Sequence, residues 1–146
     1  MLSLALYQPE IAHNLGASIR IAACFGVPLH VIEPCGFPWR DRDISRVSMD
    51  YQADIIRHRD WATFKAEAPG RLVLATTKAA VGHTAFAYSD RDILLLGQES
   101  SGVPQKIHDD IDLQVRIQMA PGARSLNLSV AAAVILAEAN RQLQRF

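Results

Sequence analysis

Polar side chains crowd a short segment directly before a long, Ala-rich apolar stretch near the end of the chain. Ser125 and Asn127 are both suited to cap the start of a helix, because their side-chain oxygens can accept hydrogen bonds from free backbone N–H groups. A capped helix start exposes amide groups that favour an anionic or carboxylate ligand. Plain capping explains one such residue but not four polar residues within six positions. The segment therefore indicates a helix start that faces a ligand, and its polar members are Arg124, Ser125, Asn127 and Ser129.

A loop with two glycines, residues 97–104, directly follows the apolar run Ile93–Leu96. Ligands of open α/β sheets bind at the carboxyl ends of strands, and glycine allows the backbone to approach a ligand closely. Glu99 places an acidic group at that edge. The loop matches neither a dinucleotide-binding nor a Walker pattern. Taken alone, the loop is explained more readily as a simple strand-to-helix turn that carries a solvated glutamate than as a ligand site.

A third segment lies on the first predicted helix, where Asn14, Gly16 and Arg20 follow one another at short spacing. Asparagine and glycine are unfavourable inside a helix. Close packing against a neighbour or contact with a ligand would each explain their presence. Arg20 is either a functional cation or an ordinary solvated helix charge.

The elements that must position these segments alternate along the chain. Short apolar runs bounded by Pro and Gly predict strands, and apolar residues at helical spacing predict helices. The alternation predicts one α/β domain over residues 1–146, with a mostly parallel sheet flanked by helices. The last helix is apolar on more than one face, which favours burial against a second subunit. The predicted strands are 2–6, 29–32, 54–59, 72–75, 93–96 and 115–117, and the predicted helices are 11–25, 41–48, 61–67, 104–109 and 127–144.

Composition excludes several classes of protein. A hydrophobic fraction of 49% argues against disorder, and a net charge of zero argues against a strongly cationic nucleic-acid binder. Cys24, Cys35 and the five histidines show no metal-binding spacing, so we expect no metal. No signal peptide and no apolar run of membrane-spanning length is visible, so we expect a cytoplasmic protein with no membrane partner.

Together and in this order, the three segments resemble the motifs of the SPOUT superfamily of trefoil-knot methyltransferases. The pattern N-x-G-x-x-x-R is present at residues 14–20, G-x-E-x-x-G-[LV]-P at 97–104 and R-S-[LM]-N-L-S at 124–129. Residues 6–11, 30–37 and 50–51 are also similar to the small tRNA 2′-O-methyltransferases that modify the wobble nucleotide. The likeness extends over essentially the whole chain.

This resemblance implies a sheet of five or six parallel strands and a C-terminal trefoil knot, which neither composition nor periodicity could indicate. It implies a homodimer that uses S-adenosylmethionine, releases S-adenosylhomocysteine and needs no metal. The expected substrate is the wobble cytidine or modified uridine of tRNA, and DNA is not an expected partner. Two alternatives stay open, namely 2′-O-methylation elsewhere in tRNA or rRNA, and a non-catalytic, knotted, dimeric RNA-binding protein.

The resemblance also carries residue roles onto matching positions. An arginine keeps its proton in proteins, so Arg20 suits phosphate positioning and alkoxide stabilisation better than the role of a base. Ser100 and Ser101 stand where relatives often place a basic residue, which weakens the case for a phosphate contact there. The expected catalytic residues are Arg20, Asn14, Glu99 and Asn127. The expected RNA-binding residues are Arg20, Arg46, Lys78 and Arg124. The expected cofactor-binding residues are Ala75, Thr76, Thr77, Gly97, Gln98, Glu99, Gly102, Ile117, Met119, Ser125 and Asn127.

Overall fold

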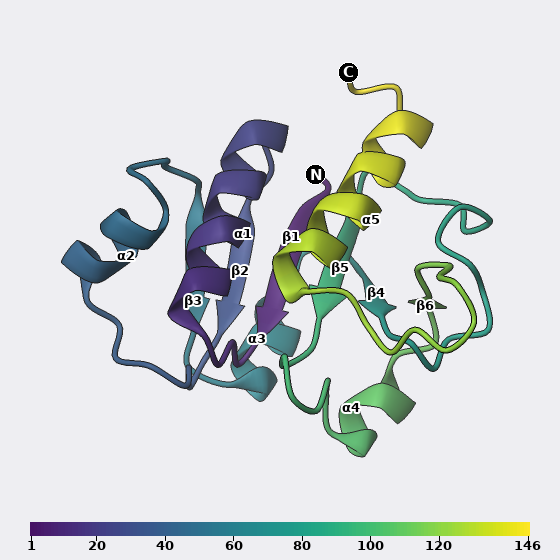
Figure 1. The fold of residues 1–146 in the computed structure, drawn as a ribbon, viewed down its shortest axis with the longest axis horizontal. Coiled ribbons are helices and arrows are strands. Elements are labelled where there is room, and N and C mark those ends of the chain that lie inside the picture. Colours follow the sequence, from purple (N-terminus) through teal and green to yellow (C-terminus); the bar gives the residue numbers. More distant parts are fainter.

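A six-stranded sheet forms the centre of the molecule in the computed structural model, which describes residues 1–146 (Figure 1). All neighbouring strands run parallel, in the order β3-β2-β1-β5-β4-β6. The predicted mostly parallel sheet is therefore confirmed. The strands are β1 (Ser3–Tyr7), β2 (Leu29–Ile32), β3 (Ile55–His58), β4 (Arg71–Ala75), β5 (Asp92–Leu96) and β6 (Gln114–Val115).

Five helices connect the strands, and their order along the chain is the predicted one. Most element ends differ from the prediction by one or two residues. The last strand is shorter than expected, because Arg116 leaves the sheet and pairs instead with Gly82. The helices are α1 (Ala12–Phe25), α2 (Asp41–Val47), α3 (Trp61–Glu67), α4 (Gln105–Asp110) and α5 (Leu128–Gln142).

The strands are buried on both faces, as the continuous apolar runs of a parallel sheet require. Leu4 and Leu6 of β1 point to the face covered by α1, α2 and α5. Ala5 and Tyr7 point to the other face, where Phe64 of α3 and residues of α4 pack. Helices on both sides of one sheet give a three-layer α/β arrangement, in which α1 and α5 lie in front of the sheet and α3 behind it (Figure 1).

The connections diverge between β1 and β5, two neighbouring strands at the middle of the sheet. The chain leaves β1 through α1 toward β2 on one side, and it leaves β5 through α4 toward β6 on the other. Such a switch in direction opens a crevice beyond the carboxyl ends of the two strands. The loops at residues 8–11 and 97–104 begin at this crevice.

Helix α5 returns the end of the chain to the middle of the molecule, where it packs against α1 on the same face of the sheet (Figure 1). Near its carboxyl end, the Gln142 side chain donates to the carbonyl oxygen of Phe86 and accepts from the backbone N–H of Tyr88. These bonds tie α5 to the loop between β4 and β5. The trefoil knot stays a prediction from the resemblance. None of the helices combines the length and the apolar character needed to cross a membrane.

Candidate active site

A chain of side-chain hydrogen bonds joins the three polar segments. Asn14 Nδ2 donates to Glu99 Oε1 over 3.3 Å, and Asn127 Nδ2 donates to Asn14 Oδ1 over 3.1 Å. These residues are 85 and 113 positions apart in sequence. An asparagine near the start of α1 is thus explained by its contacts to two other segments. We call these three residues the amide–carboxylate network.

Asn127 also caps α5. Its Oδ1 accepts from the Ser129 backbone N–H over 2.9 Å and from the Ser129 hydroxyl over 2.6 Å. Because this oxygen serves the helix start, the side-chain amide nitrogen is turned toward Asn14. Of the two residues that were plausible caps, Asn127 takes the role and Ser125 stays free for the cavity described below.

Gly16 has a different explanation from Asn14. A Cβ added there would lie 2.7 Å from Val47 Cβ and would collide with the Val47 carbonyl oxygen. The glycine therefore allows α1 to approach the carboxyl end of α2. Of the two explanations left open by the sequence, close packing applies to Gly16.

Glu10 is a site residue that the sequence analysis missed. Its backbone N–H donates to Glu99 Oε2 over 2.9 Å, and its own Oε1 accepts from the Ser100 backbone N–H and hydroxyl over 2.9 and 2.8 Å. These two bonds from Ser100, the backbone one first, hold the pKa of the Glu10 carboxyl below its usual value. The loops that follow β1 and β5 are thereby tied to each other. An acidic residue just after the first strand was the available signal.

A cavity of about 560 Å³ lies beside this network, beyond the carboxyl ends of β4, β5 and β6. Its volume is in the range of small-molecule sites. The apolar part of its wall includes Leu74, Leu96, Val115 and Ile135, which the sequence analysis did not single out. The cavity contains these expected cofactor-binding residues: Ala75, Thr76, Thr77, Gly97, Glu99, Gly102, Ile117, Met119, Ser125 and Asn127.

Gln98 is the one expected cofactor residue that does not line the cavity. Its side-chain nitrogen donates to the Gln8 carbonyl oxygen over 3.2 Å, and its side-chain oxygen accepts from the Ser101 hydroxyl over 3.1 Å. Gln98 therefore ties the loops after β1 and β5 together in this structure. Around the cavity, the polar groups are mainly hydroxyls and amides, and no cluster of three His, Cys, Asp or Glu residues suits a metal ion.

The expected cations divide into two groups. Lys78 and Arg124 line the cavity, whereas Arg20 and Arg46 do not. Arg20 Nη1 lies 3.2 Å from Met49 Sδ, and its guanidinium carbon lies 5.0 Å from the centre of the Tyr51 ring. Arg20 lies six positions after Asn14, about 9 Å along the axis of α1. Arg46 is exposed on α2 and lies 3.7 Å from Asp43.

The model of the SpoU rRNA Methylase family matches residues 1–137. The chain belongs to the SpoU methylase family. It is thus related to methyltransferases along nearly its whole length, as the three motifs had indicated.

Several relatives of known name are highly similar to this chain. A tRNA (cytidine(34)-2′-O)-methyltransferase of Ancylobacter novellus is 48% identical over 150 residues, which cover 99% of this chain and 95% of that protein. The protein of the same name from Escherichia coli K12 is 44% identical over 148 residues, with 98% and 94% covered.

Several solved structures have the same fold as this chain. One, described as giving insight into the 2-OH methylation of C/U34 on tRNA, has a TM-score of 0.94 at 36% identity and covers 100% of this chain and 98% of that one. The methyltransferase AviRb from Streptomyces viridochromogenes, in complex with AdoMet, has a TM-score of 0.84 at 26% identity. That match covers 100% of this chain and 62% of AviRb.

Proposed function

We propose that this SpoU methylase transfers the methyl group of S-adenosylmethionine to the ribose 2′-oxygen of nucleotide 34 in tRNA, a cytidine or modified uridine. The observation that carries the proposal is the amide–carboxylate network at the wall of a small-molecule cavity. Relatives that are 44% and 48% identical over nearly the whole chain are named for this reaction. A homodimer acting in the cytoplasm, where tRNA is modified, belongs to the proposal.

The cavity residues fit the proposed cofactor. Apolar walls from Leu74, Val115 and Ile135 suit a flat adenine ring, and hydroxyls of Thr76 and Ser125 can bind polar groups of the nucleoside or amino acid. Glycine at position 97 is needed, because an added Cβ would lie 2.6 Å from Gly102 Cα. The backbone at residue 97 therefore lies in close contact with the backbone at residue 102, and the side of the loop that faces the cavity stays open for the ligand. When bound, S-adenosylmethionine supplies a methyl group on a positively charged sulfur.

The chain's own residues would hold the ribose hydroxyl. Glu99 is the one carboxylate among the cavity residues. Glu99 Oε1 keeps a lone pair beyond the bond from Asn14, and Asn14 Nδ2 keeps a second hydrogen. These free positions can orient a hydroxyl for attack in line with a methyl group, and the carboxylate favours the loss of its proton. Asn127 positions Asn14 by donating to its oxygen.

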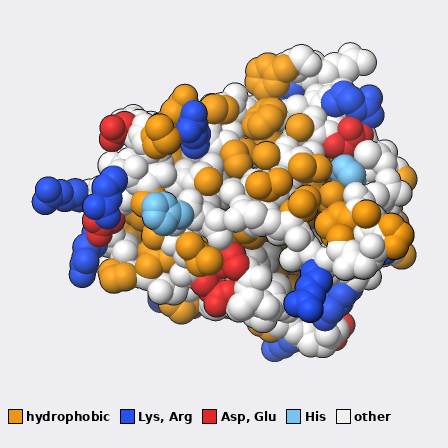
Figure 2. Space-filling view, in the orientation of Figure 1, with side chains coloured by type: hydrophobic (Ala, Val, Ile, Leu, Met, Phe, Trp, Pro, Cys, Tyr) orange, Lys and Arg blue, Asp and Glu red, His pale blue; other side chains and the backbone are white.

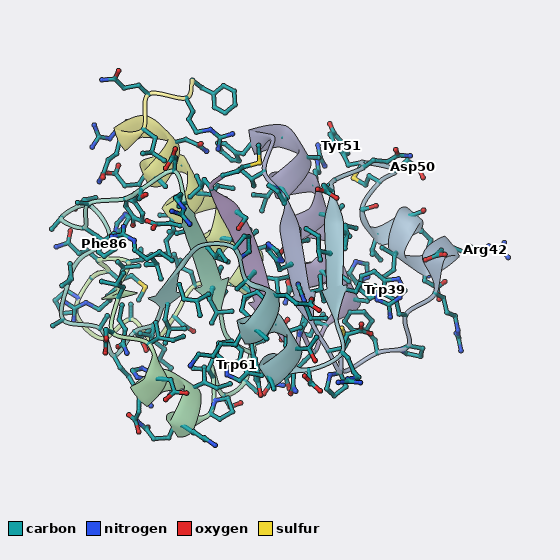
Figure 3. The ribbon with its side chains drawn as sticks, turned by 180° about the vertical axis from the view of Figure 1, so that it is seen from behind. Trp39, Arg42, Asp50, Tyr51, Trp61 and Phe86 are labelled. Atoms are coloured by element: carbon teal, nitrogen blue, oxygen red, sulfur yellow. The ribbon has the colours of Figure 1, made fainter.

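Arg20 enters the proposal through the dimer. In a single copy its guanidinium lies over the ring of Tyr51, which is labelled in Figure 3, and Arg20 does not line the cavity. Hydrophobic side chains gather on the face formed by α5 and its border with α1 (Figure 2), where Val130 is 47% exposed. A second copy would cover this face. We propose that Arg20 then acts at the cavity of the other subunit, where it stabilises the developing alkoxide and a substrate phosphate.

A methyl-transfer assay tests the function. The purified protein, labelled S-adenosylmethionine and tRNA should yield a 2′-O-methyl nucleoside that maps to position 34. If the methylated nucleoside lies at another position of tRNA, or in rRNA, the proposed reaction stands but the proposed target nucleotide is wrong. If calorimetry detects no binding of S-adenosylmethionine, the chain is a non-catalytic binder and the proposal fails.

Mixed dimers test the role of Arg20. Arg20→Ala and Asn14→Ala are each expected to lose nearly all activity as homodimers. If Arg20 acts across the interface, a mixed dimer has one site with both defects and one intact site, so equal mixing restores about a quarter of the wild-type rate. If Arg20 acts within its own subunit, every site carries a defect and mixing restores nothing. Size-exclusion chromatography and a dimer-exchange assay confirm that mixing has occurred.

A further inference from the structure

A second hollow of about 430 Å³ adjoins the cavity, and two arginines, Arg116 and Arg124, line it. We propose that it is a phosphate subsite, in which these two side chains bind a phosphodiester of the RNA strand next to the reactive ribose. This inference rests on the proposed function and adds to it a site and a residue, Arg116, to which neither the motifs nor the relatives' names point.

The hollow is continuous with the cavity through shared residues. Thr77, Ile117, Met119 and Arg124 line both. No carboxylate lines the second hollow. An RNA strand whose ribose reaches the network beside the first cavity can therefore continue, with a neighbouring phosphate, into the second hollow.

Hydrogen bonds on both sides hold the backbone of Arg116 in place. Its N–H donates to the Val81 carbonyl oxygen over 2.8 Å, and its carbonyl oxygen accepts from the His83 N–H over 2.8 Å. The side chain of Gln118 packs close to Gly82, the residue with which Arg116 pairs. Because the main chain on both sides of Arg116 is held, less order has to be created when its side chain binds a ligand.

The two guanidinium groups are free to meet an anion. Of the 15 basic residues, seven form ion pairs with carboxylates, and all seven lie outside the two hollows. The side chains of Arg116 and Arg124 appear in none of the ion pairs or hydrogen bonds of the molecule, and neither does the amine of Lys78 in the adjoining cavity. Three unpaired cations around two connected hollows create a positive site in a chain of zero net charge.

The chemistry favours a phosphodiester. A planar guanidinium presents paired N–H donors that match two phosphate oxygens. The carboxylate of the proposed cofactor is the competing anion, but the cavity assigned to that molecule has Lys78 and several hydroxyls of its own. Apart from Lys78, the unpaired cations of the two hollows are Arg116 and Arg124, and these two remain for a phosphate of the substrate.

Substitution of Arg116 distinguishes binding of an RNA phosphate from binding of the cofactor carboxylate. Arg116→Ala should raise the KM for an anticodon stem-loop about tenfold and lower the salt dependence of RNA binding by one phosphate contact. Its affinity for S-adenosylmethionine, measured by calorimetry, should stay within about twofold of wild type, because the cofactor does not occupy this hollow. Arg91→Ala is the matched control, since Arg91 is exposed, lacks a carboxylate partner and lies directly before β5, at the amino ends of the strands.

Modified RNA, combined with Arg116→Ala in a double-substitution cycle, identifies the phosphate that Arg116 contacts. Stem-loops carrying a single neutral methylphosphonate at each phosphate flanking nucleotide 34 should bind wild type more weakly at one position. At that position the loss should disappear in Arg116→Ala, because the contact is already absent. Losses that simply add at every position, an unchanged KM, or weaker cofactor binding with unchanged RNA binding would each overturn the subsite. Failure of the wild-type enzyme to methylate nucleotide 34 would instead overturn the proposed function.

Discussion

Two polar clusters lie on different sides of the same sheet. One is the amide–carboxylate network of Asn14, Glu99 and Asn127. The other is a pair of histidines on the face covered by α3, where His30 Nδ1 lies 2.9 Å from His58 Nε2. His58 Nδ1 lies 3.3 Å from a carboxylate oxygen of Glu67. Each cluster joins side chains from separate elements.

The clusters differ in what surrounds them. The network borders a cavity of about 560 Å³ and keeps unused hydrogen-bonding positions there. The histidines are closed over by Phe64, whose ring centre lies 5.7 Å from that of His30 and 5.1 Å from that of His58. Trp61 of the same helix packs against Phe64 on the side seen in Figure 3. Polar burial by itself therefore does not mark a site; access and unused donors or acceptors do. Changes to the network should affect chemistry, and changes to the histidines should affect stability.

The largest expected effect follows from removal of the central amide. Asn14→Ala leaves Glu99 and Asn127 without their shared partner, so kcat should fall about 100-fold, the loss typical of one pre-organised polar group. Methyl transfer to tRNA measures the effect. Ser18→Ala is the matched control, because Ser18 is a buried polar residue one turn further along α1 that bonds only to the Asn14 carbonyl oxygen. Equal losses in both variants would contradict a special role for the network.

A smaller effect is expected where the loop backbone approaches itself. In Gly97→Ala, the new Cβ would lie 2.6 Å from Gly102 Cα and force the loop apart. Cofactor affinity should drop about tenfold, and stability should drop by about 1–3 kcal/mol. Calorimetry and thermal unfolding measure the two quantities. In Gly70→Ala, the new Cβ would collide with the Arg91 carbonyl oxygen at the amino ends of the strands, so this variant should lose stability and keep its cofactor affinity.

Glu10 offers a finer test of the same loops. Glu10→Gln keeps an acceptor for Ser100 but removes the charge, so kcat/KM should fall about threefold. In Glu10→Ala, which also removes the acceptor, kcat/KM should fall further. Since the pKa of Glu10 is held below its usual value, the loss should be constant through the neutral range and shrink only in acid. Glu33→Gln, which breaks a surface pair with Arg57 instead, should leave kcat/KM unchanged.

The histidine cluster should respond to pH rather than to substrate. Burial, followed by the charge of His58, lowers the pKa of His30, although Asp54 opposes this shift. The unfolded chain therefore takes up a proton near pH 6.5 that native His30 resists. The stability that His30 contributes is present above that pH and is lost as the pH falls toward its folded pKa.

Thermal unfolding across this pH range provides the measurement. His30→Leu should flatten the loss of stability in mild acid and leave methyl transfer unchanged. His13→Gln, at an exposed position of α1, should retain the wild-type slope. A loss of activity in His30→Leu with unchanged cofactor and RNA binding would contradict the separation of the two clusters.

Much of the fold was accessible from local patterns. Apolar runs punctuated by Pro and Gly predicted every element in order, and Trp61–Glu67 and Leu29–Ile32 have the predicted bounds. The end of the last strand was wrong, because the pairing of Arg116 with Gly82 depends on a distant loop. Glu10 was missed for the same reason, since its partners Glu99 and Ser100 lie about 90 positions away.

The sequence by itself determined the element order, the three motif segments and the family, because spacing and residue type are local properties that relatives share. Only the tertiary structure decided that Asn14 connects Glu99 to Asn127, that Gly16 serves packing, and that Arg20 lies outside the cavity of its own chain. The tertiary structure also joined the hollow of Arg116 and Arg124 to that cavity. Hydrogen bonds act over about 3 Å, and only the folded chain brings residues this far apart in sequence within that distance.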